Sequence, residues 1–452
     1  MPLSEAAATA QAKTLLEYRT AERGRLERIR DYLRNDEDWR PVWLSSTAPL
    51  EVQQLARISR VRMLPFVVNA RSHAMYVDGF RTPRSADDAP AWDVWQRNRF
   101  DARQIGVHRS ALSYGAAYVT VLPGEPVPVM RGVSARHMTT VYGDDDDWPR
   151  FALEKRKSGW RLFDEQAVYL FDGDANGDSL QFLGSKLHSA EMDGAPVCPV
   201  VRFRETDDLD APVCGIVEPL MDLQDQIDVT TFGLLVSQQY GAFRQRYILG
   251  WMAESEEERL KVSASKMWTL EDPDIKVGEF EQNDLSGYIA SREATLRHLA
   301  TVSATPAHEL LGQLANLSAE ALAAAEAGYR RAVTENQTVL GEAHEQALNL
   351  AASYLRIAPD PSASVRWRDT ESRSLAQTVD ALGKLTQMLG VPPQELWERV
   401  PGVTDPELER WKAAAAQGDA FANLTAMLER QGAQPPEPAA EQAPGVPVGQ
   451  NA

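Results

Sequence analysis

The spacing of apolar residues along the chain predicts several helices. Residues 5–34 and 216–239 carry leucine and isoleucine at i, i+3, i+4 and i+7 intervals, so each segment has one apolar face. Pro219 suits the first turn of the second of these helices. Two further helices are predicted for residues 101–114 and 284–302.

A very long helix is predicted for residues 318–355. At 1.5 Å per residue it would reach roughly 55 Å. Alanine is frequent along it, and such small side chains allow another helix to approach closely, within one copy or between copies. Gly328 and Gly341 are the positions at which this helix can bend.

Strand-like segments gather in a mixed zone between residues 50 and 210. They are apolar or β-branched runs bounded by turn residues, at 116–123, 151–155, 167–171, 180–183 and 200–203. A short strand is predicted for 365–368, and strand-like RYILGW and KMWTL mark an insertion between the helices at 247–283. Together these patterns predict a helix-rich α+β protein.

The composition is that of a folded chain with more than one domain. It has 452 residues, 43% of them apolar. Cys198 and Cys214 are too few for a disulfide framework, and no cysteine–histidine set has zinc spacing. No run of eighteen apolar residues is present, and MPLSEAAATAQAK does not look like a signal peptide. Residues 434–452 hold five prolines and two glutamates without Lys or Arg, which predicts disorder.

The formal net charge of −18 limits how the protein can handle nucleic acid. Binding to DNA phosphates depends on neutralisation by Lys and Arg, so an acidic chain is a poor sequence-general clamp. If the protein handles DNA, we expect it to let DNA pass.

Short motifs give no reaction centre, so we predict no catalytic residue, cofactor or metal. DGDANGD at 172–178 begins like a calcium loop, but position twelve is Leu183 rather than glutamate, and a hairpin turn is favoured. The DDDD run at 144–147 is interpreted as a solvated turn. The residues from Trp95 to Phe100 are interpreted as core aromatics with surface arginines rather than a nucleotide stack.

Other catalytic signatures fail on spacing. Neither His308 nor His344 begins an H-E-x-x-H motif, and the S-x-x-K match at Ser263 and Lys266 has no accompanying motif. The absence of a P-loop predicts that the chain does not hydrolyse ATP by that mechanism.

The order of elements, more than any single motif, resembles the portal proteins of tailed bacteriophages, of the long-tailed siphophage type. GAPVCPVVRFRE (194–205), CGIVEPLMDLQDQIDV (214–229) and FRQRYILG (243–250) resemble the approach to the portal stem. ATPAHELLG (304–312) and LSAEALAAAEAGYRR (317–331) resemble the tunnel loop and the start of the kinked helix, although Ser318–Ala319 replaces the usual Ser-Gly. VRWRDTESRSLAQTVDALGKL (365–385) resembles the strand that returns to the wing and the first crown helix.

The resemblance covers about residues 1–430 and implies a portal-type subunit. Its expected parts are a wing (1–214 with 331–371), stem helices (215–246 and 284–303), a clip (247–283), a tunnel loop (304–317), a long kinked helix (318–357), a crown (372–433) and a tail (434–452).

It also implies a ring of twelve copies at one capsid vertex of the virion, assembled in the host cytoplasm. The implied partners are the major capsid protein, the terminase large subunit, a head–tail adaptor, and double-stranded DNA that passes through without sequence-specific binding. No membrane is implied. Gln313 and Asn316 are the expected DNA-facing residues of the tunnel loop, and four clip residues are expected to dock partners: Glu254, Glu256, Glu257 and Trp268. The alternative is a helical capsid-associated scaffold or adaptor without a channel.

Overall fold

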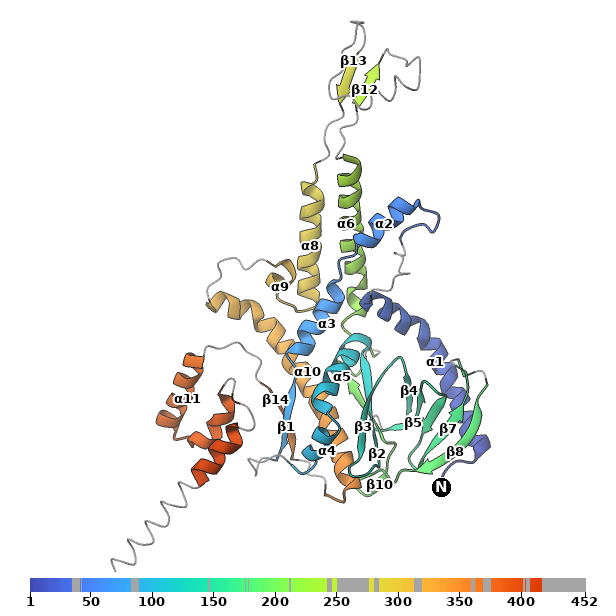
Figure 1. Ribbon diagram of the computed structural model, residues 1–452, viewed down its shortest axis with the longest axis vertical. Coiled ribbons are helices and arrows are strands. Elements are labelled where there is room, and N and C mark those ends of the chain that lie inside the picture. Colours follow the sequence, from blue (N-terminus) through green and yellow to red (C-terminus); the bar gives the residue numbers. More distant parts are fainter. Residues whose placement is uncertain are drawn as a thin grey trace, which may run out of the picture. The chain divides into compact units, whose positions relative to one another are not determined.

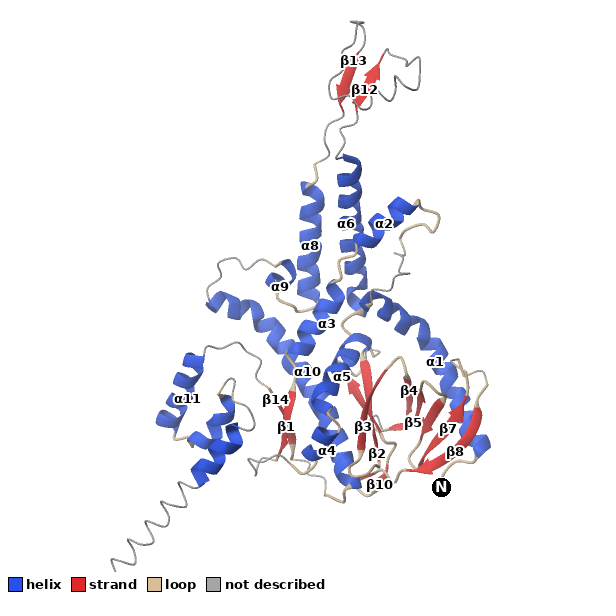
Figure 2. Ribbon diagram, viewed as in Figure 1, coloured by secondary structure: helices blue, strands red, loops and turns tan. Residues whose placement is uncertain are grey.

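The computed structural model describes residues 1–34, 41, 43–82, 89–144, 147–174, 176–177, 179–210, 213–241, 246–249, 276–279, 284–312, 319–358, 362–368, 375–400, 403 and 407–416. The chain divides into two compact units, Met1–Arg368 and Asp369–Ala452. The first unit combines helices with antiparallel strands, and the second is helical where it is described (Figures 1 and 2).

A five-stranded antiparallel meander occupies one end of the first unit. Its order is β4-β5-β6-β7-β8, formed by Met138–Tyr142, Pro149–Lys155, Trp160–Phe163, Ala167–Asp172 and Gln181–Leu187. Helix α1 (Glu5–Leu33) lies across it and buries Ala8, Ala12 and Leu15 against the sheet core. The Ser4 hydroxyl caps this helix by accepting from the Ala7 N–H at 3.3 Å.

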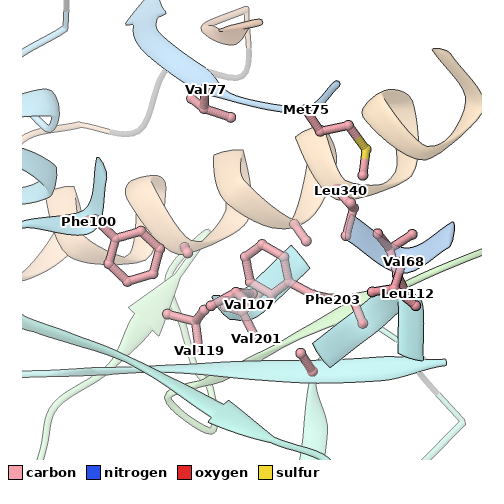
Figure 3. Close-up of a cluster of buried hydrophobic side chains, with 14 of the residues drawn as sticks. Val68, Met75, Val77, Phe100, Val107, Leu112, Val119, Val201, Phe203 and Leu340 are labelled. Carbon is pink, nitrogen blue, oxygen red and sulfur yellow. The ribbon is translucent and has the colours of Figure 1, made fainter. Parts of the chain in front are cut away.

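The second sheet has the order β11-β2-β3 and carries most of the core. Its strands are Val200–Arg204, Ala116–Leu122 and Val129–Ser134, all antiparallel. Strand β2 is apolar on both faces because α5 (Phe100–Tyr114) and α10 (Ala319–Tyr354) pack on one of them and the meander core lies on the other. Phe203, Val201 and Leu340 meet in this core (Figure 3).

Short elements complete the first unit. They are the helices α2 (Leu50–Ile58), α3 (Met63–His73) and α4 (Trp92–Arg97), the pair β1 (Val77–Arg81) with β14 (Ser364–Trp367), and the pair β9 (Glu191–Met192) with β10 (Ala195–Pro196). The β1–β14 pair joins residues that are far apart in the sequence, since Phe80 lies opposite Val365.

Two long helices lie side by side in the first unit (Figure 1). A 3-10 turn at Glu218–Leu220 leads into α6 (Met221–Gly241), and α8 (Ser286–Val302) returns beside it. A Cβ at Gly233 would lie 2.8 Å from Tyr288 Cε1, so glycine allows this close contact. Between them in sequence, β12 (Arg246–Leu249) and β13 (Lys276–Glu279) pair antiparallel.

The second unit contains α11 (Leu375–Leu389) and a 3-10 segment at Pro393–Arg399. Trp397 and Trp411 meet edge to face with ring centroids 6.1 Å apart. This contact ties the 3-10 segment to the helical residues 407–416.

The helix predictions for 5–34, 101–114, 284–302 and 318–355 are confirmed by α1, α5, α8 and α10. The helix expected from residue 216 begins at Met221, after a 3-10 turn that contains Pro219. The five strands predicted between 116 and 203 and the one at 365–368 are also present. RYIL forms β12, whereas KMWTL lies outside the described residues.

Several motif interpretations are confirmed as well. Asp172 ends β7, and the antiparallel pairing of β7 with β8 makes DGDANGD a hairpin connection. Trp95 and Phe100 are fully buried while Arg97 and Arg99 are exposed. In the DDDD run, Asp144 and Asp147 are exposed between β4 and β5.

Candidate functional site: the junction of the long helices

The residues expected to act in the tunnel loop and the clip lie outside the described residues. These are Gln313, Asn316, Glu254, Glu256, Glu257 and Trp268. The structure does describe the segments that lead to them. These include α9 (Ala307–Leu311), which ends at Gly312 in a left-handed conformation with φ 65°.

A tight turn connects α8 to α9. Ala304 is left-handed with φ 50°, and the Thr305 N–H donates to the Ala300 carbonyl at 2.9 Å. Thr305 and Pro306 before an apolar run predict a threonine cap and a proline at the first helical position, but Thr305 does not cap α9 and Pro306 occupies the N-cap position. The left-handed turn directs the Thr305 hydroxyl back, where it accepts from Ser303 Oγ at 3.0 Å. Asparagine and serine are favoured helix caps, which predicts that Asn316 and Ser318 can cap the next helix, but both residues lie outside the described residues.

Arg71 of α3 ties together the elements at this junction. It is 4% exposed, donates from Nη2 to the Ser303 carbonyl at 2.8 Å, and donates from Nη1 to Asn336 Oδ1 at 3.0 Å. Its guanidinium lies 5.4 Å from the ring centre of Tyr329. Asn336 in turn donates to the Glu205 carbonyl at 2.8 Å. One buried cation therefore fixes the end of α8 against α10, and Asn336 links α10 to Glu205, the residue after β11.

A second buried polar group fixes the base of α6. Asp228 is 1% exposed and accepts from the Val61 N–H at 2.9 Å and from Gln224 Nε2 at 2.8 Å. Burial raises the pKa of Asp228 to about 6, although these hydrogen bonds and Arg60 favour the charged form. Of the three aspartates on α6, only Asp222 is exposed. Asp225 is half-buried and accepts a hydrogen bond from the Tyr32 hydroxyl.

Two buried histidines join α5 to α10 in the core. His108 Nε2 and His344 Nε2 lie 2.8 Å apart, and both side chains are fully buried. Aromatic rings surround His344, with the rings of Trp95 and Phe203 at 5.1 and 4.7 Å between centroids. Burial lowers the pKa of His108 to about 4 and the pKa of His344 well below its usual value, so both rings are neutral at pH 7.

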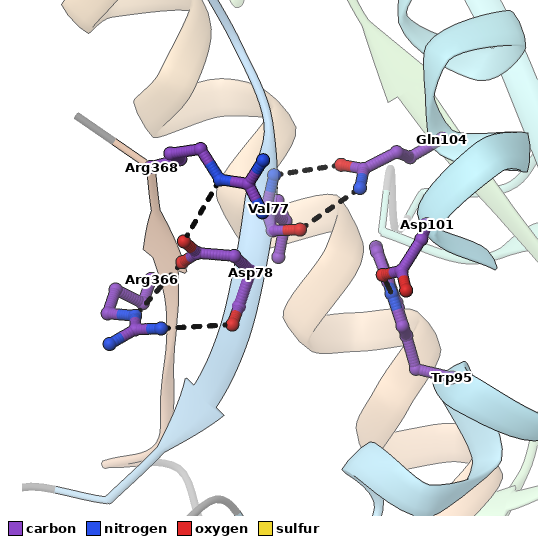
Figure 4. A network of polar contacts seen from close by, with 7 residues as sticks. All are labelled: Val77, Asp78, Trp95, Asp101, Gln104, Arg366 and Arg368. Atoms are coloured by element: carbon purple, nitrogen blue, oxygen red, sulfur yellow. Dashed lines mark hydrogen bonds and ion pairs between the residues drawn. The ribbon is translucent and has the colours of Figure 1, made fainter. Parts of the chain in front are cut away.

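The end of the first unit is held by a carboxylate on β1. Asp78 Oδ1 lies 2.9 Å from Arg366 Nε, and Asp78 Oδ2 lies 3.4 Å from Arg368 Nε (Figure 4). On the other side of β1, the Gln104 amide takes the place of a strand by accepting from the Val77 N–H and donating to its carbonyl. The last residues of the first unit are thus anchored where the chain leaves for the second.

These contacts position helices and contain no arrangement of reacting groups. Among the described residues, no three His, Cys, Asp or Glu side chains are placed to hold a metal ion. None of the helices in that part of the chain is long and apolar enough to cross a membrane. The junction is architectural, and sequence reasoning missed it because Arg71, Asp228 and the two histidines belong to no motif.

The comparisons identify the class of protein. The family model described as "Phage portal protein, SPP1 Gp6-like" matches residues 12–419. The chain is 24% identical over 420 residues to the portal protein of Mycobacterium phage D29, covering 84% of each chain. It is also 24% identical over 397 residues to the portal protein of Mycobacterium phage L5, covering 80% of this chain and 79% of the relative.

Two solved structures of gene transfer agent particles also align with the chain. One is the neck of an empty particle computed with C6 symmetry, with a TM-score of 0.48, 15% identity, and coverage of 81% of this chain and 93% of that one. The other is the virion of a native particle, with a TM-score of 0.49, 15% identity, and coverage of 80% and 96%.

Because the family model spans most of its length, the chain is a member of the phage portal protein family. Within that class it belongs to the SPP1 Gp6-like group.

Proposed function

We propose that this chain forms a ring of twelve copies at one vertex of a phage capsid, through which double-stranded DNA is packaged and later ejected. The match to the portal family over residues 12–419 carries this proposal. The net charge of −18 supports a wall that lets DNA pass, since few cations are available to hold phosphates. In this role the protein is a passive channel and an outside motor supplies the energy.

The proposed parts follow the order of elements. Residues 1–214 with 331–371 form the wing, 215–246 and 284–303 the stem, and 247–283 the clip. Residues 304–317 form the tunnel loop, 318–357 the long kinked helix, 372–433 the crown and 434–452 a tail. The side-by-side packing of α6 and α8 supports a stem made of two helices.

The proposed partners divide among these parts. The clip docks the terminase large subunit during packaging and a head–tail adaptor afterwards, and the major capsid protein surrounds the wing. Closing a ring needs two different surfaces of each copy to meet head to tail. The protein then assembles in the host cytoplasm and remains at the capsid vertex of the virion.

Electron microscopy of the purified full-length chain in negative stain tests the ring directly. We expect rings with a central hole. Compact particles or rods without a hole would overturn the channel and favour a scaffold or adaptor.

A further inference from the structure

A groove runs between helix α5 and strand β3 on the surface of the first unit, where the two elements lie side by side (Figure 1). Its volume is about 690 Å³, and residues of α5 and β3 line it. Arg103 bridges it at one position by donating to the Met130 carbonyl at 3.2 Å. Ser110 bridges it further along by donating to Ser134 Oγ at 3.1 Å. The floor between these bridges is formed around Gly106 and Gly132.

Strand β3 is an edge strand, and Gly132 presents its open edge. The sheet order is β11-β2-β3, so no described strand pairs with the outer side of β3. The Met130 N–H donates to Asn98 Oδ1 and its carbonyl accepts from Arg103, so both backbone groups of Met130 point outward. In an antiparallel ladder the direction alternates by residue, so Gly132 also turns its N–H and C=O outward.

Both backbone groups of Met130 and the carbonyl of Ser134, which point outward beside Gly132, are occupied within the molecule. Side chains hold both groups of Met130, and the Ser134 carbonyl accepts from the His137 N–H at 2.8 Å. Such occupation protects an edge strand from unwanted pairing. The N–H and C=O of Gly132 stay available on this edge, and their spacing matches the C=O and N–H of one residue in an extended peptide.

Gly132 allows strand β3 to pack closely on helix α5, and Gly106 leaves open space on that helix. A Cβ at Gly132 would lie 2.7 Å from Val107 Cγ2, so a side chain there would push the helix from the strand. A Cβ at Gly106 would meet nothing within 4 Å. Helix α5 therefore carries a glycine in its interior, at a propensity cost of about 1 kcal/mol, where no packing contact requires it.

The side chains that line the groove carry positive charge. The lining contains Arg103 and Arg131 and no aspartate or glutamate, in a chain whose formal net charge is −18. Both arginines are exposed. The groove therefore complements a segment that carries carboxylates.

We propose that this groove binds an extended acidic peptide segment of a partner protein, which pairs with the open edge of β3 at Gly132. One residue of the segment exchanges two backbone hydrogen bonds with Gly132. Its carboxylates meet the arginines that flank the groove, and the space above Gly106 takes a side chain. This inference goes beyond the channel proposal and does not depend on it.

Fluorescence anisotropy with a labelled acetyl-EVEVEVEV-amide probe tests the inference on the full-length protein at low salt. We expect saturable binding that weakens as salt rises. The Gly106→Trp variant fills the groove from an open helix position and should weaken binding at least tenfold. The Arg131→Glu variant should weaken binding without touching the bridges at Arg103 and Ser110.

Matched controls separate the groove from other causes. Gly24→Trp places the same side chain at a glycine of α1 that also has open space, and it should bind like the unaltered protein, as should Gly106→Ala. A probe in which every residue is N-methylated should lose binding because it has no backbone N–H within the segment to donate to the strand edge. Circular dichroism checks that each variant is folded. If Gly106→Trp does not fold, the binding of Arg131→Glu decides the test.

Four outcomes would overturn the proposal. They are no binding of the acidic probe, equal binding of a KVKVKVKV probe, unchanged binding by the N-methylated probe, and equal loss of binding in Gly24→Trp and Gly106→Trp. A single-stranded oligonucleotide of equal charge that competes as well as unlabelled probe would show simple attraction of anions, which also contradicts recognition of a peptide.

Discussion

Acid should loosen the core through the buried pair His108 and His344. Folding lowers the pKa of His108 from 6.5 to about 4, mainly because burial disfavours the charged ring. Above pH 6.5 His108 is neutral in the folded and the unfolded chain, and the stability of the fold does not depend on its titration. As the pH falls toward 4, the unfolded chain takes up a proton that the folded core excludes, so the free energy of unfolding decreases. Below that window the folded core must accept a proton among the rings of Trp95, Phe100 and Phe203.

The size of the effect follows from the shift of the pKa. Each unit corresponds to about 1.4 kcal/mol, so protonation of one histidine removes about 3 kcal/mol between pH 6.5 and pH 4. At about 2 cal/mol/K of unfolding entropy per residue, a unit that spans Met1–Arg368 would lose about 4 °C in Tm. His344→Leu should lower stability by about 1–3 kcal/mol already at pH 7, because His108 Nε2 loses its partner.

Thermal unfolding followed by near-ultraviolet circular dichroism from pH 7 to pH 4 measures this effect. The double variant His108→Leu with His344→Leu should lose less stability in acid than the unaltered protein, because only the smaller contributions of histidines such as His137 and His188, whose pKa values burial also lowers, remain. Replacing the exposed His298 by leucine is the control and should leave the pH profile unchanged. If the double variant shows the same loss of Tm between pH 6.5 and pH 4 as the unaltered protein, the histidine pair is not its source.

Three further predictions concern the helix junction and the tunnel loop. Asp228→Asn should raise the free energy of unfolding by roughly 1–3 kcal/mol at pH 8 and change it less at pH 4, since a buried carboxyl with a raised pKa destabilises the fold once the pH rises through about 6. Urea unfolding at both pH values measures this, and a variant that is less stable than the unaltered protein at pH 8 contradicts it. Arg71→Met should lower the free energy of unfolding, measured with urea, by about 3 kcal/mol, because the Asn336 and Ser303 acceptors lose their donor. A loss under about 0.5 kcal/mol would mean that Arg71 does not hold the junction together. Gln313→Arg or Asn316→Arg should leave rings intact but slow DNA packaging, most of all at low salt, since twelve added cations bind phosphate; normal packaging by both variants at low salt would mean that these side chains do not face DNA.

The regular elements could be predicted because their pattern is local. The apolar spacing of residues 5–34 gives α1, and the bounded run at 116–123 gives β2. The pattern does not reveal strands β3, β4 and β6, because they are only four to six residues long and show no regular alternation of apolar and polar residues. Their pairing partners, rather than their own propensity, make them strands.

The contacts of the junction could not be predicted because each depends on residues that are distant in sequence. Arg71 finds its acceptors 232 and 265 positions away, and His108 finds His344 across 236 positions. Gly341 lies within α10, and a Cβ added there would lie 3.4 Å from Val365 Cγ2 on β14, a contact that the local sequence does not reveal. Thr305 carried a local capping signal that the left-handed Ala304 redirected.

Asymmetric cryo-electron microscopy of the assembled virion is the most direct test of the central claim. The account predicts twelve copies of this chain at the single vertex that carries the tail, arranged around an axial channel that contains DNA. Density for the chain at all vertices, or at the tail vertex without a continuous channel along the axis, would contradict it.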